Sequence, residues 1–327
     1  MKKFLSLVLA LVMTMSLVTV SAGAKDFSDD DSITYQEAVD VISEIGVVDG
    51  YTGGDFKPTD VLTRGAAAKI ICNLILGPTT ASYLSADTAP FKDVPVTNVF
   101  AGYITYCSQQ GIINGYADGT FRPTATLSGN AFMKMLLGAL GYDSAIEGYT
   151  GANWTVAVIK QAAGIGLDDG NDEFVGSKAV TREEAALYAF NTLQATMVDY
   201  DQKITTNVNG VDVTISQGSS KPVTWSEGIN EDGNIKDDNF VQFAEEFFPK
   251  LVRKDDNDKF MAPANTWVFD KSEIGTYERT DLIVETYTEG VTGRDAYDLL
   301  KSGVISDNDL EAYLDGVDNY AEKNTGK

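Results

Sequence analysis

GYTGGDFKPTDVLTRGAAAKII, from Gly50 to Ile71, is followed later in the chain by GYADGTFRPTATLSGNAFMKML, from Gly115 to Leu136. Gly-Tyr, Gly, Phe, a basic residue, Pro-Thr and Leu recur in both stretches at the same spacing. The stretches differ where the first has Thr63-Arg64 and the second has Ser128-Gly129. Self-similarity of this kind predicts a repeated supersecondary unit whose copies share one core.

A third, more divergent copy lies between residues 153 and 190. It keeps Thr181-Arg182-Glu183 but has lost the Gly-Tyr pair and the proline. Each copy predicts a helix, a loop and a second helix. A glycine is expected to end each first helix, an aromatic residue in each loop to enter the core, and Thr or Ser to cap each second helix. These residues are Gly46, Gly111 and Gly164; Phe56, Phe121 and Phe174; and Thr63, Ser128 and Thr181.

Arg64 and Arg182 each follow a capping threonine. One interpretation is an ordinary solvated residue in the first turn. The other is an anion site, in which the cation stands beside free N–H groups of the helix start. The spacing of Thr181 and Glu184 also fits a capping box. Lys69 and Lys134, further along these helices, are expected to be solvated.

The composition excludes several classes of function. The chain has 327 residues, a formal net charge of −23 and no histidine. Such a surface repels phosphate backbones and anionic lipids, so neither nucleic acid nor a membrane surface is expected as a partner. The lack of histidine removes Ser-His-Asp and Cys-His catalysis and His-ligated zinc. Because no catalytic set of carboxylates stands out either, the chain is expected not to be an enzyme.

Cys72 and Cys107 are the two cysteines, and the sequence leaves open whether they pair or are separate packing residues. The acidic loops that begin at Asp168 and Asn230 lack the glycine at the sixth position and the glutamate at the twelfth position of an EF-hand. We therefore expect no cofactor and no dedicated metal site.

Residues 1–24 have the layout of a secretory signal peptide. Lys2 and Lys3 precede an apolar run, and Ala22 and Ala24 occupy the small-residue positions of a cleavage site. An uncleaved membrane anchor is the alternative. With cleavage, the mature protein is expected outside the cell with no membrane attachment.

Residues 199–327 predict a small α+β region. Alternating residues around Asn209-Gly210 predict a hairpin. A helix is expected from Phe240 to about Val252, with a break at Pro249. Strands are expected at 265–269 and 281–288, and helices at 293–303 and after Ser306.

Residues 27 to about 198 resemble three tandem S-layer homology repeats of bacterial cell-surface proteins. Four motifs carry the resemblance: an F-x-D start, a glycine-to-tyrosine turn, a G-x-F-x-P loop and a T-R-x-E-like helix start. They are Phe27/Asp29 and Phe91/Asp93; 46–51 and 111–116; 54–58 and 119–123; and 63–66 and 181–184. The copies depart from the family at Ala66 and at Ser128-Gly129-Asn130-Ala131, which contains neither arginine nor acid.

The resemblance implies a mainly α fold, in which three helix-loop-helix repeats form a pseudo-threefold bundle followed by the small α+β region. The expected segments are the signal peptide at 1–24, repeats at 25–86, 87–142 and 143–198, and a region of unknown function at 199–327. It also implies non-covalent attachment to a secondary cell-wall polysaccharide, which in part of the family carries acidic pyruvyl ketals. The ligand-binding residues it nominates are Thr63, Arg64, Thr181, Arg182 and Glu184, which gives at most two competent pockets.

The expected function is therefore that of an exported protein of the cell wall or S-layer, with a structural or display role. The alternative is the anchor portion of a surface protein that binds or processes glycans through residues 199–327. Self-association into a lattice stays open.

Overall fold

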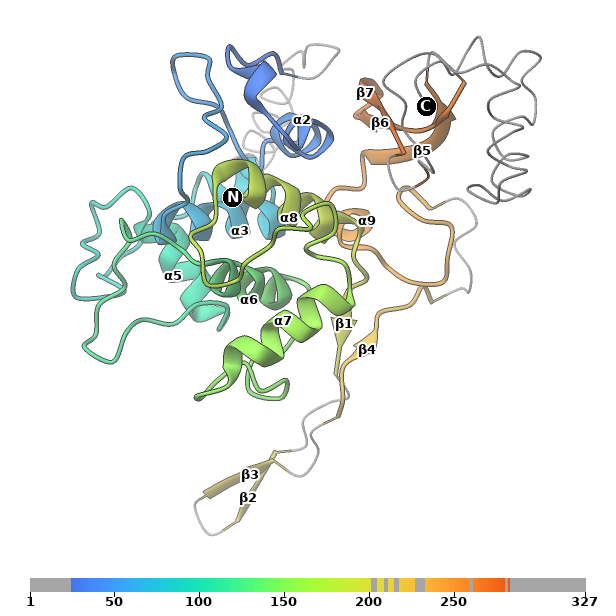
Figure 1. Ribbon diagram of the computed structural model, residues 1–327. Coiled ribbons are helices and arrows are strands. Elements are labelled where there is room, and N and C mark those ends of the chain that lie inside the picture. The colour runs from blue at the N-terminus through green and yellow to red at the C-terminus, as the bar shows by residue number, and fades with distance from the viewer. Residues whose placement is uncertain are drawn as a thin grey trace, which may run out of the picture.

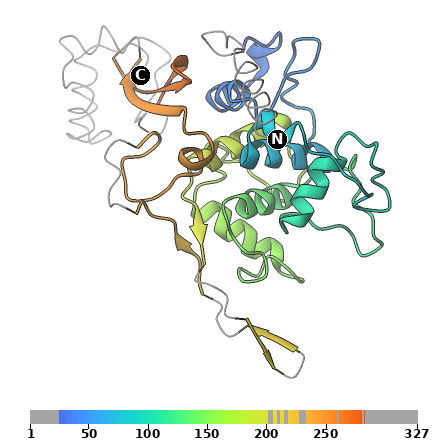
Figure 2. The same cartoon turned by 180° about the vertical axis from the view of Figure 1, so that it is seen from behind.

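The chain is rich in helices and ends in a small α+β region (Figure 1). The computed structural model describes residues 25–200, 205–208, 211–214, 218–226, 233–258, 261–279 and 282. The repeat helices form one compact group, and strands β5–β7 lie outside this group. The view from behind shows the same arrangement (Figure 2). The first part of the chain contains η1 (Asp30–Ser32), α2 (Gln36–Glu44), α3 (Arg64–Leu76), α4 (Pro78–Ala81), α5 (Ala101–Gln109), α6 (Gly129–Ala139), α7 (Trp154–Gly164) and α8 (Arg182–Gln194).

Every repeat segment has the expected two helices, and the helices pack across repeats. The first helix of each repeat lies against the second helix of the preceding one: α5 against α3, and α7 against α6. The order closes on itself because α2 of the first repeat packs against α8 of the third. One continuous apolar core runs through all three repeats, so no repeat has a core of its own.

A closed ring of backbone hydrogen bonds joins the three segments that lead into the second helices. The N–H of Leu62 donates to the carbonyl of Val180 at 2.8 Å, Val180 donates to Leu127 at 2.9 Å, and Leu127 donates to Leu62 at 2.9 Å. The predicted caps stand directly after this ring. The hydroxyls of Thr63, Ser128 and Thr181 accept the N–H groups of Ala66, Ala131 and Glu184.

The F-x-D motif and the Gly-Tyr turn form one packing unit. Asp29 accepts the N–H groups of Phe56 and Lys57, both at 2.7 Å. Burial raises the pKa of Asp29, but these backbone hydrogen bonds outweigh it and leave the pKa lowered. A Cβ on Gly50 would stand 2.6 Å from the ring of Phe27, so glycine is required there. The second copy repeats this arrangement. Asp93 accepts the N–H groups of Phe121 and Arg122, and a Cβ on Gly115 would meet the ring of Phe91.

The third copy departs from two expectations. Gly164 is the last residue of α7, and the left-handed glycine that ends this helix is Gly166, with φ 73°. Gly46 and Gly111 do have the expected positive φ. Phe174 is only half-buried, whereas Phe56 and Phe121 are fully enclosed. The helix α7 therefore runs two residues further than the sequence pattern predicts.

Cys72 and Cys107 are both free and buried, and they join α3 to α5 by packing. Their Sγ atoms lie 3.5 Å apart. Hydrogen bonding to Cys107 and burial both raise the pKa of the Cys72 thiol. Of the two alternatives, the structure shows two reduced packing residues.

The C-terminal region contains β1 (Val198–Asp199), β2 (Thr205–Val208), β3 (Val211–Thr214), β4 (Lys221–Pro222), α9 (Phe243–Phe247), β5 (Leu251–Asn257), β6 (Pro263–Phe269) and β7 (Ser272–Glu278). All pairings are antiparallel, with β1 beside β4, β2 beside β3, and β6 between β5 and β7. The β2–β3 hairpin and the strand at 265–269 confirm the predictions, and the hairpin extends away from the helices in both views (Figures 1 and 2).

The helix expected from Phe240 is wrong in its length. Residues before Phe243 are extended, since Val241 exchanges backbone hydrogen bonds with Val223 and Met197, and Phe240 pairs with Thr224. Pro249 follows the short α9, after which the chain enters β5. The apolar spacing was real, but backbone pairing with 223–225 overrides the helical preference of its first residues.

The three-stranded sheet docks on the first repeat through α2. Trp267 is fully buried, packs edge-to-face on Phe190 and donates from Nε1 to Glu37 at 2.6 Å. The hydroxyl of Tyr277 donates to Asp40 at 2.6 Å. The C-terminal sheet is therefore joined to the repeats by buried carboxylates as well as by apolar contact.

Several expectations lie outside the described residues. They are the signal peptide at 1–24, the strand at 281–288 and the helices at 293–303 and after Ser306. Among the residues that the structure does describe, no helix has the length and apolar character needed to cross a bilayer.

Asp40 predicts a pH dependence of stability. Burial raises its pKa from 3.8 to about 6, with hydrogen bonds from Tyr277 and Gln36 opposing the shift and the charges of Asp30 and Asp26 adding to it. The folded state then holds a proton that the unfolded state releases, so stability falls as pH rises through this range. Relative to Asp40→Asn, the wild-type protein should lose about 2 kcal/mol between about pH 4.5 and about pH 7. Urea unfolding of both proteins at the two pH values measures this, and a pH-independent difference would contradict it.

Candidate functional site

Arg64 is the first residue of α3, and its guanidinium lies on the loop of the next repeat. Its Nε donates to the carbonyl of Phe121 at 2.8 Å, and Nη2 donates to that of Asn114 at 3.2 Å. The guanidinium carbon is 4.4 Å from the ring centre of Phe121 and 5.1 Å from that of Tyr116. The side chain therefore spans the junction between the first and second repeats, on the Gly-Tyr turn itself.

Arg182 has the same geometry one junction earlier in the ring. Its Nε donates to Phe56 at 2.8 Å, and Nη2 donates to Asp49 at 2.9 Å. Tyr51 and Phe56 lie under the guanidinium, at 4.7 and 4.9 Å. The helix start of the third repeat thus meets the loop of the first repeat, as the helix start of the first meets the loop of the second. The structure brings the two predicted arginines into equivalent places.

The free N–H groups expected beside these arginines are not there. The N–H of Arg64 donates to Ala125, and that of Gly65 donates to Pro123. Likewise Arg182 donates to Asp60, and Glu183 to Pro58. Carbonyls of the neighbouring loop thus take the first donors of each helix, and the cap hydroxyl takes the next. The backbone part of the predicted anion site is therefore wrong, and only the guanidinium offers positive charge.

Neither guanidinium is neutralised by an ion pair within the part of the chain that the structure describes. Burial lowers the pKa of both arginines, and for Arg64 the nearby Arg122 contributes in the same direction. An arginine titrates so far above neutral pH that both keep their charge. A half-buried cation without a carboxylate partner favours an anionic ligand.

A groove of about 320 Å³ opens beside Arg64. It is bordered by Tyr116 and Asn114 from the second repeat's loop and by Lys134 and Trp154 from α6 and α7. Lys134 is not solvated as expected: it is half-buried, donates to the carbonyl of Tyr149 at 2.7 Å and lies 5.5 Å from the ring centre of Trp154. Burial lowers its pKa. The groove thus holds two cations and two aromatic faces, a combination the sequence did not reveal because α7 comes from another repeat.

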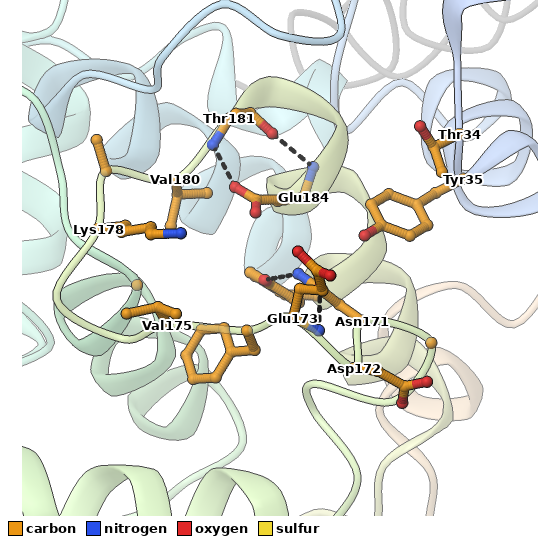
Figure 3. Close-up of a pocket in the computed structure, with 15 residues that line it drawn as sticks. Thr34, Tyr35, Asn171, Asp172, Glu173, Val175, Lys178, Val180, Thr181 and Glu184 are labelled. Carbon is orange, nitrogen blue, oxygen red and sulfur yellow. Dashed lines mark hydrogen bonds between the residues drawn. The ribbon is translucent and has the colours of Figure 1, made fainter.

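The junction between the second and third repeats has a different character (Figure 3). Its cavity of about 540 Å³ is lined by Gly129 at the place that Arg64 occupies in the first repeat. Asp172, Glu173 and Glu184 also line it, with Lys178 as the one lysine or arginine among its described lining residues. A Cβ on Gly129 would stand 2.8 Å from the ring of Phe174. The ring of Phe174 therefore occupies the space directly next to Gly129, where the side chain of an arginine would begin.

The other nominated residues position the helices. Thr63 and Thr181 cap α3 and α8, and Glu184 completes the predicted capping box by accepting the N–H of Thr181 at 2.7 Å (Figure 3). Glu184 also borders the 540 Å³ cavity and not the Arg64 groove. Glu184 therefore faces a different junction from Arg182, whose side chain lies against the first repeat's loop.

The family model of the S-layer homology domain matches residues 26–68 and 90–129. The chain carries S-layer homology domains. The first matched segment includes Arg64 and the start of α3, the second ends at Gly129, and the third repeat lies outside both.

Relatives of the chain include a bacterial surface layer protein, a cellulosome-anchoring protein and an endoglucanase. It is 23% identical to a surface layer protein of Brevibacillus choshinensis over 241 residues. The matched stretch covers 73% of this chain and 21% of that protein. It is 38% identical over 79 residues to a cellulosome-anchoring protein of Acetivibrio thermocellus, 24% of this chain and 17% of that one. An endoglucanase of Bacillus sp. is 33% identical over 105 residues, 31% of this chain and 11% of the enzyme. The chain thus spans about a fifth or less of these relatives, and the expected cell-surface location is confirmed.

Gly129 provides a test of the packing at the junction between the second and third repeats. Gly129→Ala should lower the free energy of unfolding by about 1–3 kcal/mol, because its Cβ would overlap Phe174 and approach Gly176 at 3.2 Å. Gly164→Ala is the matched control, since a Cβ there meets no atom within 4 Å. Thermal or urea unfolding should show no loss for the control; equal losses would contradict the packing assigned to Phe174.

Proposed function

We propose that the chain is an exported cell-surface protein held non-covalently to secondary cell-wall polysaccharide through its S-layer homology repeats, with a structural or display role. One observation carries the proposal: Arg64 and Arg182 are held in the same way over the next repeat's loop, each without an ion-pair partner in the described part of the chain. In a chain of net charge −23, two such cations favour a specific anionic ligand over general attraction.

The proposed architecture is a pseudo-threefold bundle of three repeats. The cyclic packing of first helices on preceding second helices supports it, as does the hydrogen-bond ring through Leu62, Leu127 and Val180. In this arrangement the third repeat is a degenerate copy that completes the core and supplies Arg182. The ligand grooves then lie between repeats, so each requires two of them.

The proposed ligand unit is an acidic sugar, such as a residue with a pyruvyl ketal. Its carboxylate pairs with Arg64, and Lys134 adds a second cation to the same groove. The aromatic faces of Tyr116 and Trp154 suit the apolar face of a sugar ring. We propose two competent grooves, at Arg64 and at Arg182, while the acidic junction at Gly129 does not bind the polymer. The repeats have no catalytic role in this proposal.

A pull-down tests the attachment. The mature chain, residues 25–327, is mixed with purified cell-wall sacculi before and after chemical removal of the secondary polymer. The whole chain is used because the C-terminal sheet packs on α2. Binding should be lost when the polymer is stripped, since the sugar carboxylates leave with it. Undiminished binding to stripped walls would refute the proposal.

Substitutions separate the junctions. Arg64→Ala and Arg182→Ala should each weaken binding to sacculi about tenfold or more, because each removes a charge-assisted contact. Asn130→Ala, at the second position of α6 in the acidic junction, should change binding little. Thermal unfolding of each variant identifies any loss that comes from the hydrogen bonds to Phe121 or Phe56. If all three substitutions weaken binding equally in folded proteins, the arginines have no specific role in binding the polymer.

A further inference from the structure

A second kind of cavity, of about 730 Å³, lies where the third repeat meets the C-terminal region. Neither the repeat grooves nor the matched family segments include it. One wall comes from α8 and the α7–α8 loop, and the other comes from β4, β5 and the segment before α9. Its volume falls within the usual range of small-molecule sites, about 300–1,000 Å³.

Arg253 on β5 is the principal charged group of this cavity. Its Nη1 donates to the side-chain oxygen of Gln194 at 3.3 Å, while its Nε is buried without an acceptor among the described residues. Its one ion pair within that part of the chain joins Nη2 to Asp255 at 3.8 Å, and Asp255 is 77% exposed. Such a long contact with a solvated carboxylate is weak. The guanidinium is half-buried, with its side chain 21% exposed, and its weakly paired charge favours an anionic ligand in the cavity.

The nearby buried carboxylate, Glu37, does not take that role. The positive charge of Arg253 helps to lower the pKa of Glu37 against the larger effect of burial, so the two are within electrostatic reach. Glu37 uses its Oε1 for Trp267 and Asn265, and no ion pair of 4.0 Å or less joins Glu37 to Arg253. The guanidinium therefore remains the charged donor of the cavity.

Lys236 is the second cation of the cavity. It is exposed, and within the described ranges its ammonium forms no ion pair. Both cations belong to the C-terminal wall, and Asp169, on the opposite wall, is the one carboxylate among the lining residues. The lining thus has one net positive charge, which suits a ligand with a single negative charge better than a doubly charged phosphate.

The opposite wall offers neutral hydrogen-bonding groups. Asn191 uses its amide nitrogen for the carbonyls of Leu167 and Asp169, which leaves its side-chain oxygen as an acceptor. Gln194 uses its oxygen for Arg253, which leaves its amide nitrogen as a donor. Tyr142 and the partly exposed Phe240 add aromatic surface to the lining. Paired amide groups with aromatic faces suit a hydroxyl-rich ring.

We propose that this cavity is a second ligand site, and that it binds an acidic monosaccharide unit of the uronic-acid class. The carboxylate of the sugar pairs with Arg253 and Lys236, and its hydroxyls meet Asn191 and Gln194. The site does not depend on Arg64 or Arg182. It gives the C-terminal region a binding role of its own, built jointly with the third repeat.

The test uses the mature chain, residues 25–327, with D-glucuronic acid as the probe and D-glucose as its uncharged counterpart. Titration followed by NMR should show glucuronate binding with a Kd on the order of 1 mM, and binding of glucose about tenfold weaker or more. Lys236→Gln should weaken glucuronate binding about tenfold, and Arg253→Gln should abolish it. Lys254→Gln is the matched control, an exposed lysine on the same strand that does not line the cavity.

The outcomes separate this site from the wall-binding grooves. Arg64→Ala should leave glucuronate binding unchanged, whatever it does to binding of sacculi. If Arg253→Gln fails to fold, Lys236→Gln decides, because that side chain is exposed. No glucuronate binding at concentrations on the order of 10 mM would overturn the proposal. So would equal affinity for glucose, or equal effects of Lys236→Gln and Lys254→Gln.

Discussion

The three repeats depend on one constraint: the first N–H groups of each second helix must find acceptors away from water. A helix start leaves several donors unpaired, and here the carbonyls of a neighbouring loop accept them, as Pro123 and Ala125 do for α3. Because the acceptors belong to another repeat, no repeat can complete its own helix. The ring through Leu62, Leu127 and Val180 extends the same exchange to the segments before the caps. Burial of the shared core and pairing of the backbone therefore require the same neighbours.

The position of the arginines is a consequence of that exchange. Once the backbone of Arg64 is pinned to the next repeat's loop, its side chain has the Gly-Tyr turn directly beneath it. The loop supplies carbonyls for one edge of the guanidinium and aromatic rings for its face. The F-x-D aspartate holds that loop by accepting the N–H groups of Phe121 and Arg122. Motifs far apart in the sequence thus act together to hold an arginine at two of the three junctions.

The sequence predicted the local features that recur in each repeat, and it did not predict the contacts that form between repeats. The caps at Thr63, Ser128 and Thr181 were predictable because an N-cap is a local feature. Arg64 and Arg182 were identified by their place after those caps. Lys134 was missed because its partners, Tyr149 and Trp154, lie in another repeat. The helix expected from Phe240 failed for a similar reason, since residues distant in sequence pair with its first residues. Long-range pairing leaves no periodic signal in the segment it overrides.

The divergence of the second repeat's helix start now has a physical reading. Gly129 provides no cation where the first and third repeats have an arginine, and the ring of Phe174 lies 2.8 Å from where a Cβ would stand. The same junction gathers Asp172, Glu173 and Glu184, which would repel an acidic sugar. Both the charge and the packing of this junction therefore differ from those of the groove beside Arg64. Meanwhile the third repeat, which lost the Gly-Tyr turn, keeps Arg182 because that arginine acts on the first repeat's intact turn. The loop and the arginine of one repeat belong to different junctions. A repeat can therefore lose its Gly-Tyr turn while its arginine still contacts the intact turn of another repeat.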